Sequence, residues 1–547
     1  MSAMIANLTY VLPMSTSNFN LPPQLTDWHP YKNSQITDLC LILGDQLNAK
    51  HSWFQQVQSQ RLFVFMELAQ EANYVTHHQQ KILAFFAAMR SFAMALHQAD
   101  HQVLYLSLDA AVNSGNLTAN LDQLITQLGI TTVHLQQPDE YRLDQQLQQW
   151  ATVQPSVSVT WCDTEHFICA RDVLQQWFGD KPSYLMEAFY RRLRKQTGYL
   201  VDEHQQPFGG QWNYDKSNRN KLPAKHKVPA PLLFANDTSE LADMLQRMGI
   251  KTMGSAQPDK LLWPVNRQQS LQLLDYFLEY LLPNFGLYQD AMTESSWAVY
   301  HARLSFSLNT KMLSPKLVIE RAIDYWQQHQ ERISLAQIEG FVRQILGWRE
   351  FVRAIYWQFM PNYKALNYFK HHRPLPDYFW TGDTKMRCLQ HSLSQSLDYA
   401  YAHHIQRLMV IGNFSLLTEL DPDAVDQWYL GVYIDAIEWV ELPNTRGMSQ
   451  FADGGIVASK PYVASGNYVN KMSSYCSNCH YQVKLKSGEK SCPLNSLYWH
   501  FIEQKQELFA NNPRMSLVIK QWQQRSPSER NDILATAQRY LEQLNSL

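Results

Sequence analysis

The sequence predicts a fold in two parts: a doubly wound α/β domain with a parallel sheet, followed by an all-α domain. In the first part, short apolar runs alternate with helical patterns. From about residue 267 onward, apolar residues recur only at helical spacing. We expect an N-terminal extension at 1–36, the α/β domain at 37–178, a connector at 179–266 and the helical domain at 267–547.

The composition is that of a globular protein. Its 547 residues suffice for two or three domains, with 45% hydrophobic and 18% charged residues. The net charge of −2 gives no whole-chain indication of nucleic-acid binding. The N-terminus lacks the cationic region of a secretory signal, and no uncharged apolar run approaches the length of a membrane span. Seven cysteines in such a chain favour a reducing cytoplasm, away from any membrane.

Five apolar runs are predicted to form the buried strands of a parallel sheet. They span residues 38–44, 61–67, 102–107, 132–136 and 156–161, and a helix is predicted at 77–97. Residues 1–36 are polar and contain proline, which predicts an irregular extension. Gly44-Asp45-Gln46-Leu47 follows the first strand in place of Gly-x-Gly-x-x-Gly, so ordinary dinucleotide binding is not expected there.

The connector has few periodic elements, but it contains two basic segments. The first holds Arg191, Arg192, Arg194 and Lys195 within five positions. The second lies beside Trp212 and Tyr214 and comprises Lys216, Arg219, Lys221, Lys225 and Lys227. Basic residues next to aromatic ones can neutralise phosphates and stack on an unpaired base. The alternative is a solvated surface with a few buried aromatic side chains.

The second part of the chain is predicted to be a series of helices. Apolar residues share one face from Leu271 to Leu281. Further helices are predicted at 336–358, 390–411, 424–437 and from 497 to the end.

The predicted helix at 390–411 carries two adjacent histidines. Its apolar stripe runs through Leu397, Tyr401 and Leu408 and includes His404, whereas His403 lies off the stripe. A histidine on an apolar stripe is more often a core residue, but beside a reactive ligand it would be a proton donor. Arg407, one turn from His403, could pair with a carboxylate.

Four of the seven cysteines form one pattern: Cys388, the close pair Cys476 and Cys479, and Cys492 followed by Pro493. A Cys-x₂-Cys pair with a later Cys-Pro is typical of iron–sulfur ligation. A structural zinc site uses the same close pair but usually a second such pair as well. Spacing alone favours an iron–sulfur cluster and leaves zinc and unligated core thiols open.

Several segments together resemble one family. They are 41–47 (LILGDQL), 209–215 (GGQWNYD), 347–350 (GWRE), 402–409 (AHHIQRLM), 439–444 (WVELPN), 451–455 (FADGG) and the four cysteines. Their order and joint presence resemble the photolyase/cryptochrome superfamily, in particular its iron–sulfur bacterial branch, the prokaryotic (6-4) photolyases. The resemblance covers nearly the whole chain after the extension.

The resemblance implies three cofactors. FAD is expected in the helical domain, near His301, Ser305, Arg407, Asp435, Glu441 and Asn444. A 4Fe–4S cluster is expected on Cys388, Cys476, Cys479 and Cys492. The antenna 6,7-dimethyl-8-ribityllumazine is expected in the α/β domain, with Asp45, Glu71 and Tyr74 as candidate contacts.

The resemblance also implies light-driven repair of (6-4) photoproducts in UV-damaged DNA, single- or double-stranded, by a monomer. His404 is the expected proton donor, with His403 beside it. The expected electron route comprises Trp380, Trp428, Tyr429 and Tyr468. The expected DNA contacts are Arg191, Arg192, Arg194, Trp212, Lys216, Arg219, Trp348 and Arg349.

The chain departs from the family pattern at two positions, and other functions compete. Ala302 stands where many members carry a hydroxyl residue, and Glu441 stands where the superfamily usually has asparagine. The first alternative is a cryptochrome-type blue-light photoreceptor without repair. A light-independent iron–sulfur nucleic-acid enzyme would need a tight acidic motif, which the sequence lacks. Repair of cyclobutane dimers is disfavoured by the His403–His404 pair.

Overall fold

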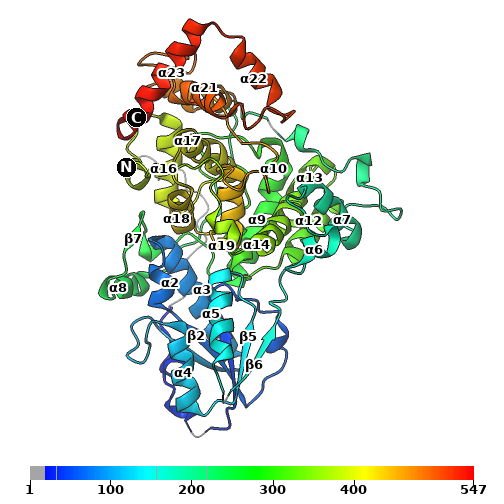
Figure 1. Cartoon of the computed structure of the whole chain (residues 1–547). Coiled ribbons are helices and arrows are strands. Elements are labelled where there is room, and N and C mark those ends of the chain that lie inside the picture. The colour runs from blue at the N-terminus through cyan, green and yellow to red at the C-terminus, as the bar shows by residue number, and fades with distance from the viewer. Residues whose placement is uncertain (1–18, 33, 156, 219, 224) are drawn as a thin grey trace.

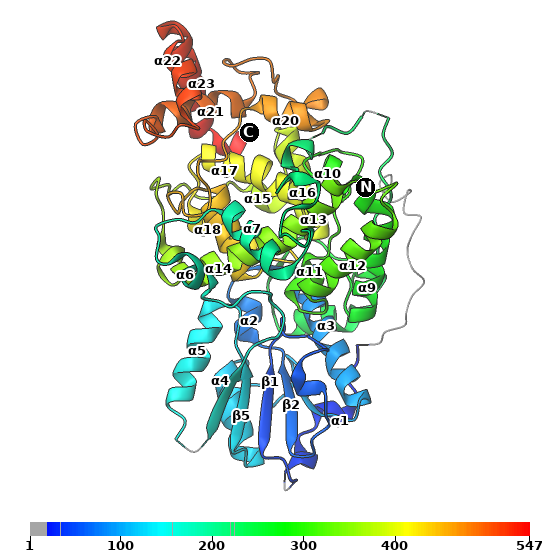
Figure 2. The ribbon, with the colours of Figure 1, turned by 90° about the vertical axis from the view of Figure 1, so that its right-hand side faces the viewer.

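The computed structural model describes residues 19–32, 34–155, 157–218, 220–223 and 225–547. A parallel sheet flanked by helices lies at one end of the molecule, and helices α21 to α23 lie at the other (Figures 1 and 2). The predicted fold class, a parallel α/β domain followed by a helical domain, is confirmed. The domain boundaries that we placed at 36, 178 and 266 stay predictions.

The main sheet has five parallel strands in the order β4-β2-β1-β5-β6. They are β1 (Asp38–Ile42), β2 (Arg61–Met66), β4 (Gln102–Leu106), β5 (Thr132–Gln136) and β6 (Ser158–Cys162), close to the predicted runs. The central strands are buried along almost their whole length because helices cover both faces. The strand order reverses between β1 and β5, which opens a crevice at their carboxyl ends.

Helices cover this sheet on both faces. They are α3 (Gln79–Gln98), α4 (Leu117–Leu128) and α5 (Tyr141–Thr152). Helix α2 (Ala69–Asn73) borders the pocket at the carboxyl end of β1, and α6 (Val173–Phe178) packs against helix α14 (Glu350–Phe359) of the helical domain (Figure 1). The side chain of Asn116 caps the start of α4 by accepting from the Ala119 amide, and Gly129 ends that helix with a positive φ of 69°. A short parallel pair, β3 (His77–His78) and β7 (Thr252–Met253), has no counterpart among the predicted strands.

The part of the N-terminal extension that the structure describes packs against the α/β domain, although its only helices are the short α1 and one 3-10 turn at His29–Tyr31. Phe19, Leu25 and Trp28 are buried in the apolar cores beside the sheet. Helix α1 (Pro23–Thr26) lies against the edge strand β4, and Tyr31 donates a hydrogen bond to the Val103 carbonyl of β4 at 3.0 Å. Large apolar side chains spaced among polar residues therefore fix this segment. Residues 1–18 lie outside the described residues.

The connector is more regular than predicted. It contains α7 (Met186–Thr197) and α8 (Ser239–Arg247). Helix α7 buries Phe189, Tyr190 and Leu193 against the helical domain and leaves its basic side chains mostly outside.

The helical domain comprises α9 (Arg267–Tyr276), α10 (Leu282–Tyr288), α11 (Ser305–Asn309), α12 (Pro315–Gln328), α13 (Leu335–Val342), α14 (Glu350–Phe359), α15 (Tyr378–Thr381), α16 (Arg387–Tyr399), α17 (Asn413–Leu417), α18 (Pro422–Val432), α19 (Glu438–Leu442), α20 (Gly466–Met472), α21 (Pro493–Lys505), α22 (Ser516–Gln523) and α23 (Pro527–Glu542). π-helical turns at Gln406–Gly412 and Pro443–Ser449 carry Arg407 and Asn444. Such turns are frequent at functional sites. No helix among the described residues is long and apolar enough to cross a membrane.

The predicted continuous helix at 390–411 is wrong, and the break reverses the two histidines. Helix α16 ends at Tyr399, Ala400 adopts a positive φ of 52°, and the chain becomes helical again only at His404. The break starts a new helix, so the side chains after it point in other directions than they would in one continuous helix. As a result His403 is buried, with 2% of its surface exposed, and His404 is exposed, contrary to the prediction.

A buried cation joins the two domains. Lys311, which follows α11, is almost fully buried, and its ammonium donates to Asp45 Oδ2 at 2.9 Å and contacts Asp139 Oδ2 at 2.7 Å. Both carboxylates belong to the α/β domain and follow β1 and β5. The pair of ion pairs therefore fixes the carboxyl edge of the sheet against the helical domain.

We predict that Lys311→Met lowers the free energy of unfolding by about 3 kcal/mol, because it removes the counter-ion of the half-buried Asp45 and one of the cations around the buried Asp139, which keeps Arg353. Urea denaturation measures the loss. The control is Lys486→Met, which removes an exposed ion pair with Glu529 and should cost less than about 1 kcal/mol. Equal effects of the two substitutions would contradict the role assigned to Lys311.

Candidate functional site

The two histidines lie in the helical domain beside a third, His301. The His403 ring stacks on the His301 ring at 4.6 Å between centroids and 12° between planes. His404 has an exposed side chain, yet desolvation by the surrounding protein lowers its pKa to about 4. A side chain that is accessible and desolvated at the same time lines an internal recess, not the outer surface. Burial likewise lowers the pKa of His301 to about 4.

Three of the expected flavin residues contact one another beside this pair. Arg407 forms a two-point ion pair with Asp435, at 3.0 Å and 3.3 Å, and Ser305 Oγ donates to Asp435 Oδ2 at 2.6 Å. The guanidinium of Arg407 also lies over the Tyr433 ring at 3.8 Å. Tyr433 was not among the predicted site residues.

Glu441 lies near this ion pair, and Asn444 follows three residues later in the chain. Glu441, on α19, is buried and accepts a hydrogen bond from Thr445. Burial raises its pKa to about 6, and the Arg407 charge opposes that rise. Asn444 is half-buried, and its amide donates to the Val440 carbonyl at 2.8 Å.

The antenna candidates line one pocket at the carboxyl end of β1. Asp45, Glu71 and Tyr74 all face an empty volume of about 940 Å³, part of which is open to solvent. Ala436 and Ile437 of the helical domain close its far side. The pocket occupies the crevice where the strand order reverses, the expected ligand position in an open parallel sheet.

Two charged residues of this pocket escaped the prediction. Glu140 follows β5, and burial raises its pKa to about 7. Lys81 is buried on α3, and its ammonium donates to the carbonyls of Leu430 and Ala436 at 2.6 and 2.7 Å. Lys81 stands four residues before Phe85, on the apolar stripe of the helix. A lysine on the apolar face of a predicted helix could have identified Lys81 as a buried residue from the sequence alone.

The candidate electron-route residues form a stack that begins at the surface. Trp380 is 57% exposed and stacks on Trp428, with 6.4 Å between centroids and 7° between planes. Trp428 is buried and contacts Tyr429 and Tyr433 at 5.5 and 5.9 Å. The stack therefore leads from solvent to the ring beneath Arg407. Tyr468 lies elsewhere, on α20, the helix that borders the cysteine pocket.

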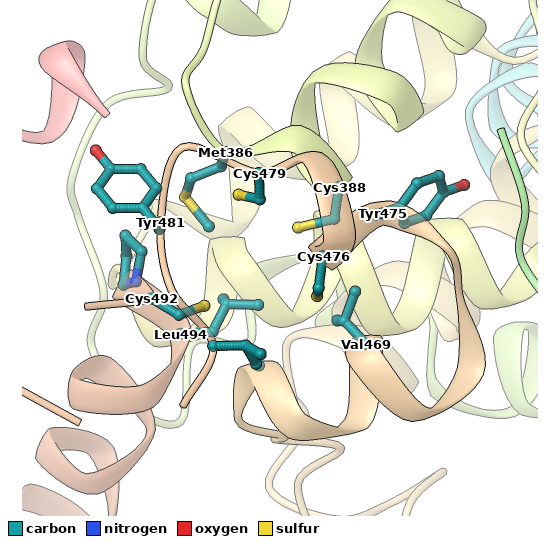
Figure 3. Close-up of a pocket in the computed structure, with 12 residues that line it drawn as sticks. Met386, Cys388, Val469, Tyr475, Cys476, Cys479, Tyr481, Cys492 and Leu494 are labelled. Atoms are coloured by element: carbon teal, nitrogen blue, oxygen red, sulfur yellow. The ribbon is translucent and has the colours of Figure 1, made fainter. Parts of the chain in front are cut away.

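The four predicted cysteines line a single pocket. Cys388, Cys476, Cys479 and Cys492 surround one small space that is otherwise apolar (Figure 3). Burial and the neighbouring thiols raise the pKa of Cys476 to about 11 and that of Cys388 far above its usual value. A Cβ added to Gly466 would approach Cys492 Sγ to 2.6 Å, so the glycine is needed at this wall.

Among the described residues, no three His, Cys, Asp or Glu side chains form a group that could hold a metal ion. The four sulfur atoms line a common pocket without converging on one point (Figure 3).

The structure contradicts two of the predicted DNA contacts. Arg194 is 1% exposed and donates to the carbonyls of Trp212, Tyr199 and Leu200, so it fixes the connector. Arg349 is 9% exposed, donates to Asn309 and the Leu308 carbonyl, and lies over Trp439. Both cations have partners that are distant in sequence, which no local pattern indicates.

The other predicted contacts lie at the surface of the connector or near it. Arg191, Arg192 and Lys216 are exposed, and Trp212 and Trp348 are half-buried. Arg191, Arg194 and Lys195 surround the Trp212 ring at 5.7, 5.2 and 5.5 Å. Arg219 lies outside the described residues.

The sequence matches known proteins along almost its whole length. A family model described as "Deoxyribodipyrimidine photo-lyase-related protein" matches residues 40–261. The chain is 38% identical over 513 residues to a protein of Agrobacterium fabrum named (6-4) photolyase. That match covers 93% of this chain and 100% of the relative.

Two solved structures share the fold. A bacterial class III photolyase from Agrobacterium tumefaciens superposes with a TM-score of 0.53 at 16% identity, covering 80% of this chain and 86% of that one. The cryptochrome of Synechocystis sp. PCC6803 superposes with a TM-score of 0.55 at 13% identity, covering 81% and 89%. At these identities the likeness is one of fold.

We predict that acid weakens the fold through the desolvated imidazole of His301. The pKa of His301 is about 4 in the folded protein and about 6.5 in the unfolded chain, so between these values the unfolded chain binds more protons. The free energy of unfolding should therefore fall as the pH falls from 6.5 to 4, by up to about 3 kcal/mol for this one residue.

His301→Phe keeps a ring against His403 and cannot be protonated. Urea denaturation at several pH values should show a shallower acid dependence in this variant than in the unmodified protein. His204→Asn, at a surface histidine that is 80% exposed, is the control. If both variants show the same acid dependence, the assignment to His301 is wrong.

Proposed function

This chain belongs to the photolyase/cryptochrome superfamily, and on that basis we propose that it is a light-dependent (6-4) photolyase. The predicted resemblance is confirmed by the match to a (6-4) photolyase along that relative's entire length. The histidine pair beside the Arg407–Asp435 ion pair is the structural observation that supports the activity.

The family binds FAD, and the recess of the helical domain suits it. A charged pair, a hydroxyl and an accessible histidine converge there, within a largely buried shell. Arg407, Asp435 and Ser305 would hold the cofactor, with Glu441, Asn444 and His301 around it. When bound and reduced, FAD supplies the light-excited electron for repair.

We propose that His404 donates the proton that repair requires. We further propose that the imidazole takes up this proton from solvent when DNA binds. Before DNA binds, desolvation keeps the imidazole neutral at pH 7, since its pKa is about 4. Phosphates and an anionic lesion would raise that pKa, because a nearby negative charge favours the imidazolium. The buried His403 would act through its neighbour, by fixing the backbone from which His404 projects.

We propose that electrons reach the site along Trp380, Trp428 and Tyr429. The parallel stacking of Trp380 on Trp428 and the contact between Trp428 and Tyr429 support this route. An exposed tryptophan at the outer end gives access to an external reductant. The expected role of Tyr468 in electron transfer stays a prediction.

We propose that the pocket at β1 takes 6,7-dimethyl-8-ribityllumazine. Asp45 and Glu71 offer acceptors to ribityl hydroxyls, and Tyr74 offers an apolar face to a planar ring. Lys81 and Glu140 add polar groups at the same wall. A few polar groups in an otherwise apolar pocket give a planar ligand one orientation.

We propose a 4Fe–4S cluster on Cys388, Cys476, Cys479 and Cys492. A single zinc ion would draw four sulfurs to about 2.3 Å from one point. The four thiols instead line the wall of a common apolar pocket, which suits a larger inorganic core.

We propose that the protein binds UV-damaged DNA, single- or double-stranded, as a monomer. Arg191, Arg192 and Lys216 would contact phosphates, with Trp212 beside them. Trp348, half-buried on the neighbouring helical segment, is the further candidate. A lesion flipped out of the stack would then reach His404.

We predict that the purified protein repairs an oligonucleotide with a defined (6-4) lesion in blue or near-UV light but not in darkness, and leaves a cyclobutane dimer unrepaired. His404→Ala should lower repair about 10²-fold or more while FAD stays bound and photoreducible. Trp380→Phe should slow the photoreduction of FAD but leave repair by protein whose FAD is already reduced unchanged.

Two outcomes would count against this function. Repair in darkness would exclude the photochemical mechanism. Light-dependent flavin reduction without repair of any lesion would favour a cryptochrome-type photoreceptor, since the Trp380 stack serves that function equally well.

We predict that the purified protein contains about four iron atoms and four sulfide ions per chain. Cys388→Ser should lose them, because it removes one of the four ligands. Cys162→Ser is the control, since Cys162 lies on β6, far from the pocket in sequence and absent from its lining. Iron and sulfide analysis with absorption spectra measures both, and a colourless protein that contains zinc would falsify the cluster assignment.

A further inference from the structure

Gln406 is a buried amide that makes four hydrogen bonds to three neighbouring groups. Only 1% of its surface is exposed. It exchanges two hydrogen bonds with the Gln395 amide at 3.0 and 2.9 Å, and it donates to the Tyr475 hydroxyl at 3.1 Å. Its Oε1 also accepts from the His403 backbone amide at 3.1 Å. Both donors and the acceptor oxygen are therefore fully used.

Two of these partners belong to segments that carry the cysteines. Tyr475 lines the cysteine pocket and directly precedes Cys476 in the turn Tyr475–Asn478 (Figure 3). Gln395 lies on α16, whose second residue is Cys388. Gln395 also donates to the carbonyls of Trp297 and Tyr401 at 3.0 and 3.1 Å. Gln406 therefore contacts both α16, which carries Cys388, and the turn that carries Cys476.

On its other side Gln406 fixes the start of the helix that carries His404. The chain is helical from His404, so His403 occupies the N-cap and Gln406 the third helical position. A glutamine there can reach back to the N-cap amide, which has no partner within the helix. The bond to the His403 amide is this contact. His403 itself gives no side-chain cap, since its buried Nδ1 has no hydrogen-bond partner among the described residues.

We propose that Gln406 is a positioning residue that couples the cysteine pocket to the histidine pair. When the four thiols are held, Tyr475 and α16 are fixed, and Gln406 fixes the helix start that orients His404 and Arg407. When the thiols are released, the Tyr475 contact loosens and the histidine pair loses its orientation. The inference gives the cysteines a role in site geometry, and only its consequence for repair rests on the proposed function.

Tyr475→Phe tests the coupling in the holoprotein, because it removes the hydroxyl that Gln406 contacts and keeps the ring in the pocket wall. We expect iron and FAD contents to stay unchanged. Hydrogen exchange in the segment 400–406 should become about five-fold faster, the effect of losing one hydrogen bond worth about 1 kcal/mol. The control is Tyr105→Phe, which removes a buried hydroxyl bonded to Glu67 in the α/β domain. It should leave exchange at 400–406 unchanged.

Gln406→Met, outside the pocket lining, is the second variant and covers the case in which Tyr475→Phe does not retain iron. It should accelerate exchange at 400–406 at least as much, with iron retained. Combined with Tyr475→Phe, its effect should be less than additive, since both changes break the same contact. Gln406→Glu, which keeps the acceptor for the His403 amide, should restore part of the protection and part of any repair activity.

The exchange data separate this inference from the proposed function. If Tyr475→Phe accelerates exchange at 400–406, less than additively with Gln406→Met, and the protein repairs no lesion, the coupling stands and the repair function fails. If repair is normal and neither variant changes exchange there, or if the two effects simply add, the coupling is overturned.

Discussion

The Arg407–Asp435 ion pair is the interaction on which the organisation of the helical domain depends. Burying two charges costs several kcal/mol per ion unless other bonds satisfy them. Here Ser305 donates to the carboxylate, and the guanidinium donates to the Ala402 carbonyl at 2.6 Å. Tyr429 completes the set by donating to the Arg407 carbonyl at 2.7 Å. The pair therefore joins the histidine segment to the segment that follows α18.

Residues of the α/β domain act on that same junction. The two carbonyls that hold Lys81 belong to Leu430 and Ala436, on either side of Tyr433. The ammonium thus fixes the backbone around Asp435 from the side of the antenna pocket. One buried lysine therefore contacts both the pocket at β1 and the backbone that carries Asp435.

The sequence allowed the strands to be predicted well, since helices on both faces make the central strands β1 and β2 almost wholly apolar. It also identified the four cysteines, although only the folded chain places Cys388 beside Cys492. The sequence-based prediction failed where one residue interrupts a helical pattern. The left-handed Ala400 cannot be distinguished from a helical alanine by type, and it decides which histidine is buried. It failed likewise for Arg194 and Arg349, whose burial depends on distant partners.

The segment from Phe19 to Tyr31 has a consequence for self-association. An uncovered edge strand offers unpaired backbone groups to any other extended chain, including a second copy of itself. Helix α1 and the Tyr31 hydroxyl cover β4, one edge of the main sheet. A chain shortened to about residue 34 would present that strand to its neighbours in solution. The segment before the sheet thus shields one sheet edge from pairing with another strand, independent of any chemistry in the helical domain.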